Sequence, residues 1–264
     1  MASPSPSTPR RRIVGVSTKM YFSASRTAQY ISELLGIISC SPMAVLVPDI
    51  LNQLDVFVIP DHVTLTSVIA QLAGTPILTG AQDAFHEDAG AYTGEVSPAV
   101  LSEVGCRLVE LGHAERRRLF GETDADVSRK AAAAARNGLI PLVCVGERTR
   151  GQVSVAVDEC KLQVEAVLSQ LPDDAEVVLA YEPVWAIGAA EPAGADHVVA
   201  VAKQIRDLEC VRRRKDDATR ILYGGSAGPG LFEKIKDGVD GLFLGRFAHD
   251  PAQFYSTILE VAAA

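Results

Sequence analysis

The sequence has no long apolar run, no excess of positive charge and no regular cysteine pattern. No apolar stretch approaches the ~18 residues that a membrane-spanning helix needs. The formal net charge of -8 argues against a nucleic-acid or membrane-surface role, although a local positive site for an anionic substrate remains compatible with it. The five cysteines are scattered and without metal-ligand spacing, so we expect reduced, buried thiols in an intracellular, cytoplasmic protein.

Residues 1–12 lack the apolar centre of a secretory signal and combine a Ser/Pro-rich start with three consecutive arginines. Their lack of acidic residues would also fit a transit peptide, but the segment is short and broken by proline. We therefore predict a disordered tail over residues 1–12. No composition break follows it, so a single domain is expected over residues 13–264.

The remainder alternates short β-rich runs with longer helical patterns. The expected strands are Ile13–Ser17, Val56–Pro60, Pro76–Gly80, Arg107–Leu111, Ile140–Val145, Glu176–Ala180, Arg220–Tyr223 and Gly241–Gly245. Met43–Val47 competes for the second position, and rejecting it makes residues 41–54 an insertion. Most runs are continuously apolar, which is typical of a parallel sheet buried on both faces. Eight strand–helix units in about 250 residues predict an α/β (β/α)8 barrel. A doubly wound open sheet is the alternative, weakened by the missing Gly-rich fingerprint after the first strand.

Several helix ends are also marked in the sequence. Ser25 is expected to cap a first helix that ends at Gly36. Thr123 marks the start of another helix, which Asn137-Gly138 would stop. Asp250-Pro251 supplies a cap and an N1 proline for the last helix.

Polar residues follow the strands at the end where a parallel barrel carries its active site. They occur in Ser17-Thr18-Lys19, Gly112-His113-Ala114-Glu115, Tyr181-Glu182, Gly224-Gly225-Ser226 and Gly245-Arg246. A Lys, a His and a Glu thus converge on one mouth, next to glycine turns whose backbone N–H groups suit a phosphate. Glu182 precedes a proline and a small-residue segment, which is typical of a base beneath a movable lid.

Each residue also has an ordinary structural interpretation. Glu182 and Lys19 are of types that are usually solvated in loops, and His113 would otherwise be a surface or core histidine. Glu115 stands before three arginines, where a surface ion pair is worth under ~1 kcal/mol. Arg246 would otherwise point to solvent. Their common location at one end of different strands favours the functional interpretation.

The chain resembles the triosephosphate isomerase family from about Ile13 to the last helix. The resemblance is carried by Lys19-Met20, Gly80–Asp83, Gly90–Ser97, Glu110–Arg117, Val143–Glu147, Tyr181–Gly188 and Tyr223–Ser226. It implies an isomerase that interconverts dihydroxyacetone phosphate and glyceraldehyde 3-phosphate, as in glycolysis and gluconeogenesis. It further implies that Glu182 is the base, that neutral His113 polarises the carbonyl, and that Lys19, held by Glu115, adds positive charge.

The resemblance also implies how the substrate is held and how the chain assembles. The phosphate would contact backbone at Gly188, Ser226 and the Gly245 turn, while Tyr223 and Ser226 latch the lid. The family is commonly a homodimer, and Thr93 in the Gly90–Ser97 loop would contact the neighbour's site. The implied partner is a small phosphorylated sugar, with no metal, organic cofactor, nucleic acid or membrane.

The sequence departs from the family around the substrate. Ser17 replaces an Asn, Arg246 replaces the second glycine of the phosphate turn, and Pro192 should stiffen the lid. Arg246 would either bind phosphate through its charged fork or face solvent. The changes favour, as an alternative, an isomerase of a longer phosphorylated ketose such as a tetrulose phosphate. A binding protein that has lost activity is a third hypothesis, which the intact Lys19, His113 and Glu182 disfavour.

Overall fold

The computed structural model describes residues 11–40, 51, 53–189 and 192–264. The predicted tail lies outside the described residues except for Arg11 and Arg12, and Arg12 already belongs to the first strand. The predicted insertion at 41–54 and the rejected strand Met43–Val47 also lie outside them, apart from Leu51, Gln53 and Leu54.

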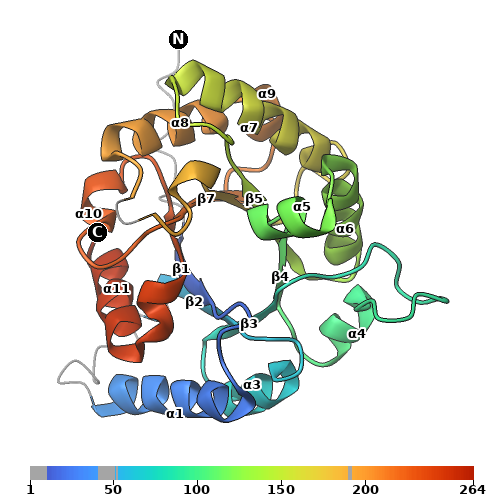
Figure 1. Ribbon diagram of the computed structural model, residues 1–264, viewed down its shortest axis with the longest axis vertical. Coiled ribbons are helices and arrows are strands. Elements are labelled where there is room, and N and C mark those ends of the chain that lie inside the picture. Colours follow the sequence, from blue (N-terminus) through green and yellow to red (C-terminus); the bar gives the residue numbers. More distant parts are fainter. Residues whose placement is uncertain (1–10, 41–50, 52, 190–191) are drawn as a thin grey trace.

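Eight parallel strands form a closed barrel in sequence order (Figure 1). They are β1 (Arg12–Ser17), β2 (Leu54–Ile59), β3 (Leu78–Ala81), β4 (Leu108–Leu111), β5 (Ile140–Val145), β6 (Val177–Tyr181), β7 (Thr219–Gly224) and β8 (Gly241–Leu244). Each overlaps its predicted strand, and β2 pairs with both β1 and β3, which confirms the choice of the second candidate. Pairing of β8 with β1 closes the barrel, so the predicted (β/α)8 fold is confirmed and the open-sheet alternative is wrong.

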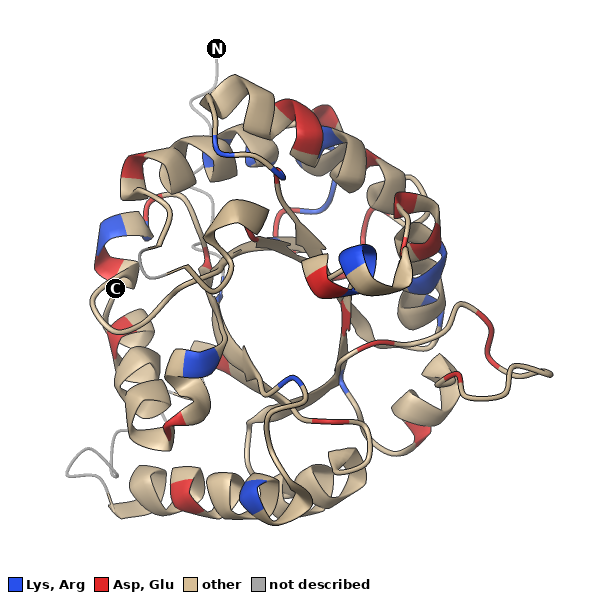
Figure 2. Ribbon diagram, in the orientation of Figure 1, with Lys and Arg blue, Asp and Glu red and all other residues tan. Residues whose placement is uncertain are grey.

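Helices surround the barrel and cover the outer faces of its strands (Figure 1). They are α1 (Ala24–Cys40), α3 (Leu65–Leu72), α4 (Pro98–Glu103), α5 (Ala114–Phe120), α6 (Asp124–Arg136), α7 (Val153–Leu168), α8 (Ala195–Asp207), α9 (Glu209–Arg212), α10 (Phe232–Ile235) and α11 (Pro251–Ala263), with 3-10 turns η1 (Val184–Ala186) and η2 (Arg246–His249). Figure 2 shows most charged residues on these helices and on the connecting segments. The strands are apolar on both faces because one face meets the helices and the other fills the barrel.

For two of the three helices, the predicted ends agree with the structure. Thr123 and Asp126 form a reciprocal capping box at the start of α6, and Asp250 accepts a hydrogen bond from the Ala252 amide in front of α11. The prediction for the first helix is wrong at both ends. The Ser23 hydroxyl, not that of Ser25, accepts the Arg26 amide. The helix continues past Gly36 because the isoleucines that follow it pack against the core.

Ion pairs occupy the N-terminal end of the barrel. The buried guanidinium of Arg220 contacts Asp55 at 2.5 Å and also pairs with Glu176. Breaking a buried pair leaves an uncompensated charge, so these contacts hold that end of the barrel together. The cavity described below lies at the opposite end, where the strands have their C-termini. Within the described residues, no helix is long and apolar enough to cross a membrane.

None of the five cysteines forms a disulfide. Cys106, Cys144 and Cys160 are buried, as expected. Cys210 is partly exposed, and Cys40 is exposed, contrary to the prediction, because it ends α1 outside the face that packs on the core. Burial raises the pKa of the Cys106 thiol to about 11, so that thiol stays protonated at neutral pH.

Candidate active site

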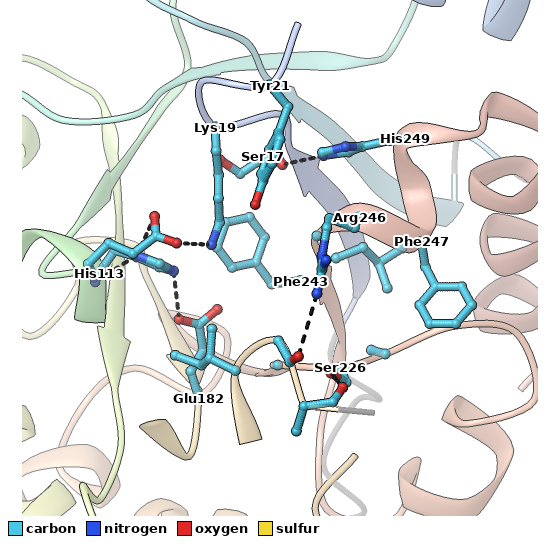
Figure 3. A pocket seen from close by; sticks show the side chains of 18 of the residues that line it. Ser17, Lys19, Tyr21, His113, Glu182, Ser226, Phe243, Arg246, Phe247 and His249 are labelled. Atoms are coloured by element: carbon cyan, nitrogen blue, oxygen red, sulfur yellow. Dashed lines mark hydrogen bonds and ion pairs between the residues drawn. The ribbon is translucent and has the colours of Figure 1, made fainter. Parts of the chain in front are cut away.

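A cavity of about 510 Å³ lies at the C-terminal ends of the strands. Every residue predicted for the site lines it: Ser17, Lys19, His113, Glu115, Glu182, Gly188, Ser226, Gly245 and Arg246. Figure 3 shows the titratable groups of Lys19, His113 and Glu182 on one side and Arg246 with Ser226 on the other. The cavity is therefore divided into a reacting side and a side that can hold an anion.

Glu182 follows the last residue of β6 and is 6% exposed. Its backbone N–H donates to the carbonyl of Val145, which continues the strand pairing and fixes where the side chain starts. The carboxylate folds closely over Gly224, where a Cβ atom would come within 2.3 Å of Oε1. Any side chain at position 224 would collide with the Glu182 carboxylate, so this position requires glycine. Its Oε2 is buried without a hydrogen-bond partner among the described residues and is free to accept a proton.

His113 is the N-cap of α5, and the geometry of that cap fixes its tautomer. The backbone N–H of Glu115 donates to Nδ1 at 3.2 Å, so Nδ1 carries a lone pair and the proton of the neutral ring lies on Nε2. Nε2 is 3.6 Å from Oε2 of Glu182, too far for a hydrogen bond. A substrate between the two would meet an N–H donor and a carboxylate base.

Lys19 and Glu115 form an ion pair at the same side of the cavity, with Nζ 2.8 Å from Oε1. Burial acts to lower the pKa of Lys19, but the hydrogen bond to Glu115 and the carboxylate of Glu182 outweigh it and raise that pKa. Lys19 is therefore a cation at neutral pH. Its backbone has φ 49, a conformation unique among the non-glycine described residues, and the Gln82 amide donates to its carbonyl at 2.8 Å. The surrounding contacts hold this lysine in place at a cost in strain.

The opposite side of the cavity is lined by backbone amides. The amides of Gly188, Ser226 and Gly245 donate no hydrogen bond within the described part of the chain. Gly188 has φ +69, which favours glycine. Arg246 lines the cavity and is exposed to solvent, and its Nη2 lies 3.5 Å from the Gly188 carbonyl (Figure 3). Free amides beside a guanidinium suit a phosphate group.

The segment after β6 is fastened at several points beside this anion side. The Ser226 hydroxyl donates to the Ala189 carbonyl at 2.5 Å, and the Tyr223 hydroxyl accepts the Ala193 amide at 3.0 Å. Trp185 donates to the buried carboxylate of Glu147 at 2.8 Å. These contacts place the predicted latch residues against the predicted lid.

Glu110 is the main site residue that the sequence interpretation missed. It lies in β4, lines the cavity and is 4% exposed. Burial raises its pKa to about 7, while the neighbouring His113 and Ser17 act in the opposite direction. The sequence did contain a signal for it, because a Glu stands inside an apolar strand. It lies two residues after the inward-facing Leu108, so strand alternation predicts that it also faces the barrel interior. The cavity also includes residues that no motif marked: Tyr21, Phe243, Phe247 and His249.

The arrangement can move a proton next to a carbonyl. It combines an unpartnered carboxylate oxygen, an imidazole N–H and an ammonium group, as proton abstraction with stabilisation of the resulting oxyanion requires. No group of three or more His, Cys, Asp or Glu side chains among the described residues is arranged to hold a metal ion.

Comparison with known proteins identifies relatives of two kinds. The sequence model of the triosephosphate isomerase family matches residues 12–261. An L-erythrulose-1-phosphate isomerase of Pectobacterium atrosepticum is 47% identical over 93% of this chain and 93% of its own. A second protein of that name, from Mesorhizobium japonicum, is 39% identical over 95% and 97%. A triosephosphate isomerase of a Thermoanaerobacter species is 38% identical over 89% and 94%.

Proposed function

The chain belongs to the triosephosphate isomerase family, and from this premise we propose that it is an isomerase of a four-carbon ketose 1-phosphate such as L-erythrulose 1-phosphate. The reaction class rests on one observation: the Nε2 of His113 and the free Oε2 of Glu182 face each other at 3.6 Å beside an amide-lined anion side. The four-carbon substrate is favoured by the relative at 47% identity and by the changed lining at Ser17 and Arg246.

The proposed step moves the carbonyl by one carbon. Glu182 removes the proton from C3 of the ketose, and the Nε2–H of His113 donates to the carbonyl oxygen on C2. The electron pair of the C3–H bond forms the C2–C3 double bond of an enediolate, and Lys19 stabilises its negative charge. The hydroxyl proton on the C3 oxygen moves to the C2 oxygen through Nε2 of His113, and Glu182 returns its proton to C2, which leaves a hydroxyl on C2 and the carbonyl on C3. Positioned proton transfer of this kind contributes roughly 10²–10⁴-fold to the rate.

The product differs from that expected of an aldose–ketose isomerase. In a four-carbon ketose 1-phosphate, C3 bears a terminal CH₂OH group, so a carbonyl at C3 is again a ketone. In the three-carbon substrate the same step produces an aldehyde. The proposed reaction therefore converts one ketose phosphate into another.

Residue roles in substrate binding follow from the same geometry. Gly188, Ser226 and Gly245 would donate backbone N–H groups to the phosphate, and Arg246 would pair with it. The contacts that Ser226 and Tyr223 make with the segment after β6 would keep water from the enediolate, which otherwise loses phosphate.

We also propose that the chain forms a homodimer. A second cavity, of about 470 Å³, lies beside the Lys19–Glu115 pair and is bordered by the exposed apolar side chains of Met20, Leu119 and Phe120. The segment before α4, which carries Thr93, projects from the body of the barrel (Figure 1) and has the shape of an arm that could enter this cavity in a second copy. Such an arm would cover the outer side of Lys19. Light scattering should give the dimer mass, and a Phe120→Glu variant should be monomeric and far less active.

A comparison of substrates tests the proposed function. Wild-type protein should turn over the four-carbon ketose 1-phosphate with a kcat/KM at least ~10-fold above that for dihydroxyacetone phosphate. Glu182→Gln should reduce kcat by roughly 10³-fold or more on the preferred substrate, because an amide cannot accept the proton. The Glu103→Gln variant, at an exposed position on α4, should keep its rate.

The contrary results are equally specific. Preference for the three-carbon phosphate would establish the second candidate function, triosephosphate isomerisation, which the Thermoanaerobacter relative supports. No turnover of either phosphate would favour a binding role. An unchanged rate in Glu182→Gln would show that another group is the base.

A further inference from the structure

Glu110 is a carboxylate built into the floor of the cavity. The inward face of β4 carries Leu108 in the apolar layer of the barrel interior, and Glu110, two residues later, lies on the same face one layer nearer the mouth. It lines both the 510 Å³ cavity and the 470 Å³ cavity beside Lys19. None of the steps proposed above uses it.

Two polar atoms at this floor lack partners. Oε2 of Glu110 and Oγ of Ser17 are both buried and make no hydrogen bond of good geometry among the described residues, although the Ser17 hydroxyl lies close enough to Glu110 to act on its pKa. Ser17 is 2% exposed and also lines both cavities. A buried polar atom without a partner costs free energy, and such atoms next to a cavity are satisfied when a ligand supplies the missing hydrogen bonds.

The chemistry of the surrounding lining determines what this ligand group is. The amide side, with Arg246, suits the phosphate, and His113 with Glu182 faces the reacting carbons. A carboxylate at the floor repels a phosphate, which orients the substrate with its phosphate away from Glu110. The neutral, hydroxyl-bearing end of the substrate is the part left for the floor.

We propose that Glu110 and Ser17 bind the terminal hydroxymethyl group of the four-carbon substrate and so determine its preference over the three-carbon phosphate. This inference rests on the proposed function. The hydroxyl donates to the Glu110 carboxylate and accepts from the Ser17 hydroxyl, which provides partners for both atoms. Dihydroxyacetone phosphate has no carbon at that position and leaves both unsatisfied.

The test pairs enzyme variants with two substrates that differ in one hydroxyl. The first is the four-carbon ketose 1-phosphate, and the second is its 4-deoxy analogue, which keeps the carbon and lacks the terminal hydroxyl. Glu110→Gln and Glu110→Leu are compared with wild type, and Glu103→Gln, an exposed position on α4, serves as the control for the loss of a carboxylate. Ser17→Ala removes the other partner, and a melting curve for each variant verifies folding.

The expected result is a loss that depends on the hydroxyl. Wild type should prefer the hydroxylated substrate by roughly 10- to 100-fold in kcat/KM, as expected for a hydrogen bond to a charged group. Glu110→Leu should abolish that preference while changing the rate on the deoxy analogue less than about 3-fold. Ser17→Ala should reduce the preference partly. If Glu110→Leu does not fold, Glu110→Gln, which keeps size and shape but offers the hydroxyl a neutral amide oxygen, should reduce the preference several-fold without abolishing it.

Other outcomes separate the two proposals. One outcome is that wild type is active on the four-carbon substrate while the Glu110 variants lose activity equally on both compounds. In that case Glu110 supports the site without binding the hydroxyl, so this inference is wrong and the proposed function still stands. An unchanged preference in every variant has the same meaning. If wild type does not turn over the four-carbon substrate, the proposed function fails and this inference with it.

Discussion

The Glu110→Gln variant should gain stability relative to wild type as the pH is raised. The difference in free energy of unfolding between the variant and wild type should be larger at pH 8 than at pH 5. Burial raises the pKa of Glu110 from 4.5 to about 7. Between these values the folded protein holds a proton that the unfolded chain has released, so the free energy of unfolding of wild type falls as pH rises through this window. A glutamine cannot ionise and does not contribute this loss.

The size of the effect follows from the shift. A displacement of about 2.5 units at 1.36 kcal/mol per unit is about 3 kcal/mol, the full difference reached once pH exceeds the folded pKa. About 2.5 kcal/mol of this difference develops between pH 5 and pH 8, because part of it is already present at pH 5. At about 2–4 °C per kcal/mol for a chain of this length, the melting temperature of Glu110→Gln relative to wild type should rise by about 5–10 °C between these pH values. Comparing two pH values cancels any constant effect of the substitution on packing.

Thermal or urea unfolding at pH 5, 6, 7 and 8, at one protein concentration, measures this difference. The concentration is fixed because assembly would otherwise shift the midpoint. Glu103→Gln, an exposed position on α4, controls for the loss of a carboxylate. Parallel curves for Glu110→Gln and wild type across the whole range would refute the reasoning, since they would mean that Glu110 titrates alike in the folded and unfolded states.

Three further predictions concern the cavity. Lys19→Met should lower kcat by roughly 10²–10³-fold in steady-state assays, because the enediolate loses its cation; a change in KM alone would contradict this. Arg246→Ala should raise KM for the phosphorylated substrate about 10-fold with little change in kcat, whereas unaltered KM would mean that the guanidinium does not contact phosphate. Tyr223→Phe removes one hydrogen bond worth about 1 kcal/mol, so kcat/KM should fall about 5-fold and release of inorganic phosphate should increase; tight coupling to isomerisation would exclude a latch.

The architecture was predictable because the strands are continuous apolar runs. A strand buried on both faces shows no polar alternation, and eight such runs separated by helical segments fit few folds other than a closed parallel barrel. The helix boundaries depended on local chemistry. Thr123 and Asp126 each accept a hydrogen bond from the other's backbone N–H, and they lie only three positions apart, so the start of this helix could be predicted from the local sequence. The end of α1 was not, because Ile37 and Ile38 extend the helix through contacts with distant parts of the chain.

The site was predictable to the extent that it lies at strand ends. Once the barrel was expected, the residues after each strand had to share one mouth, which brought Lys19, His113 and Glu182 together without any distance information. What the sequence did not reveal is the state of each group. The Nε2–H tautomer of His113 depends on the backbone of Glu115, and the role of Arg246 depends on its position in the cavity lining.

Glu110 shows why a buried functional carboxylate is hard to find in a sequence. Within Leu108–Leu111 it is one ionisable residue among apolar neighbours, and the sequence pattern still predicts a buried strand. Its importance appears only when burial, the unpartnered Oε2 and the cavity are known together. A residue that lowers the stability of the free protein by about 3 kcal/mol at pH 8 needs a compensating role. If a substrate hydroxyl satisfies that carboxylate, bound substrate should stabilise wild type more than it stabilises Glu110→Leu. The cost in the free protein and the specificity for substrate would then have the same physical origin.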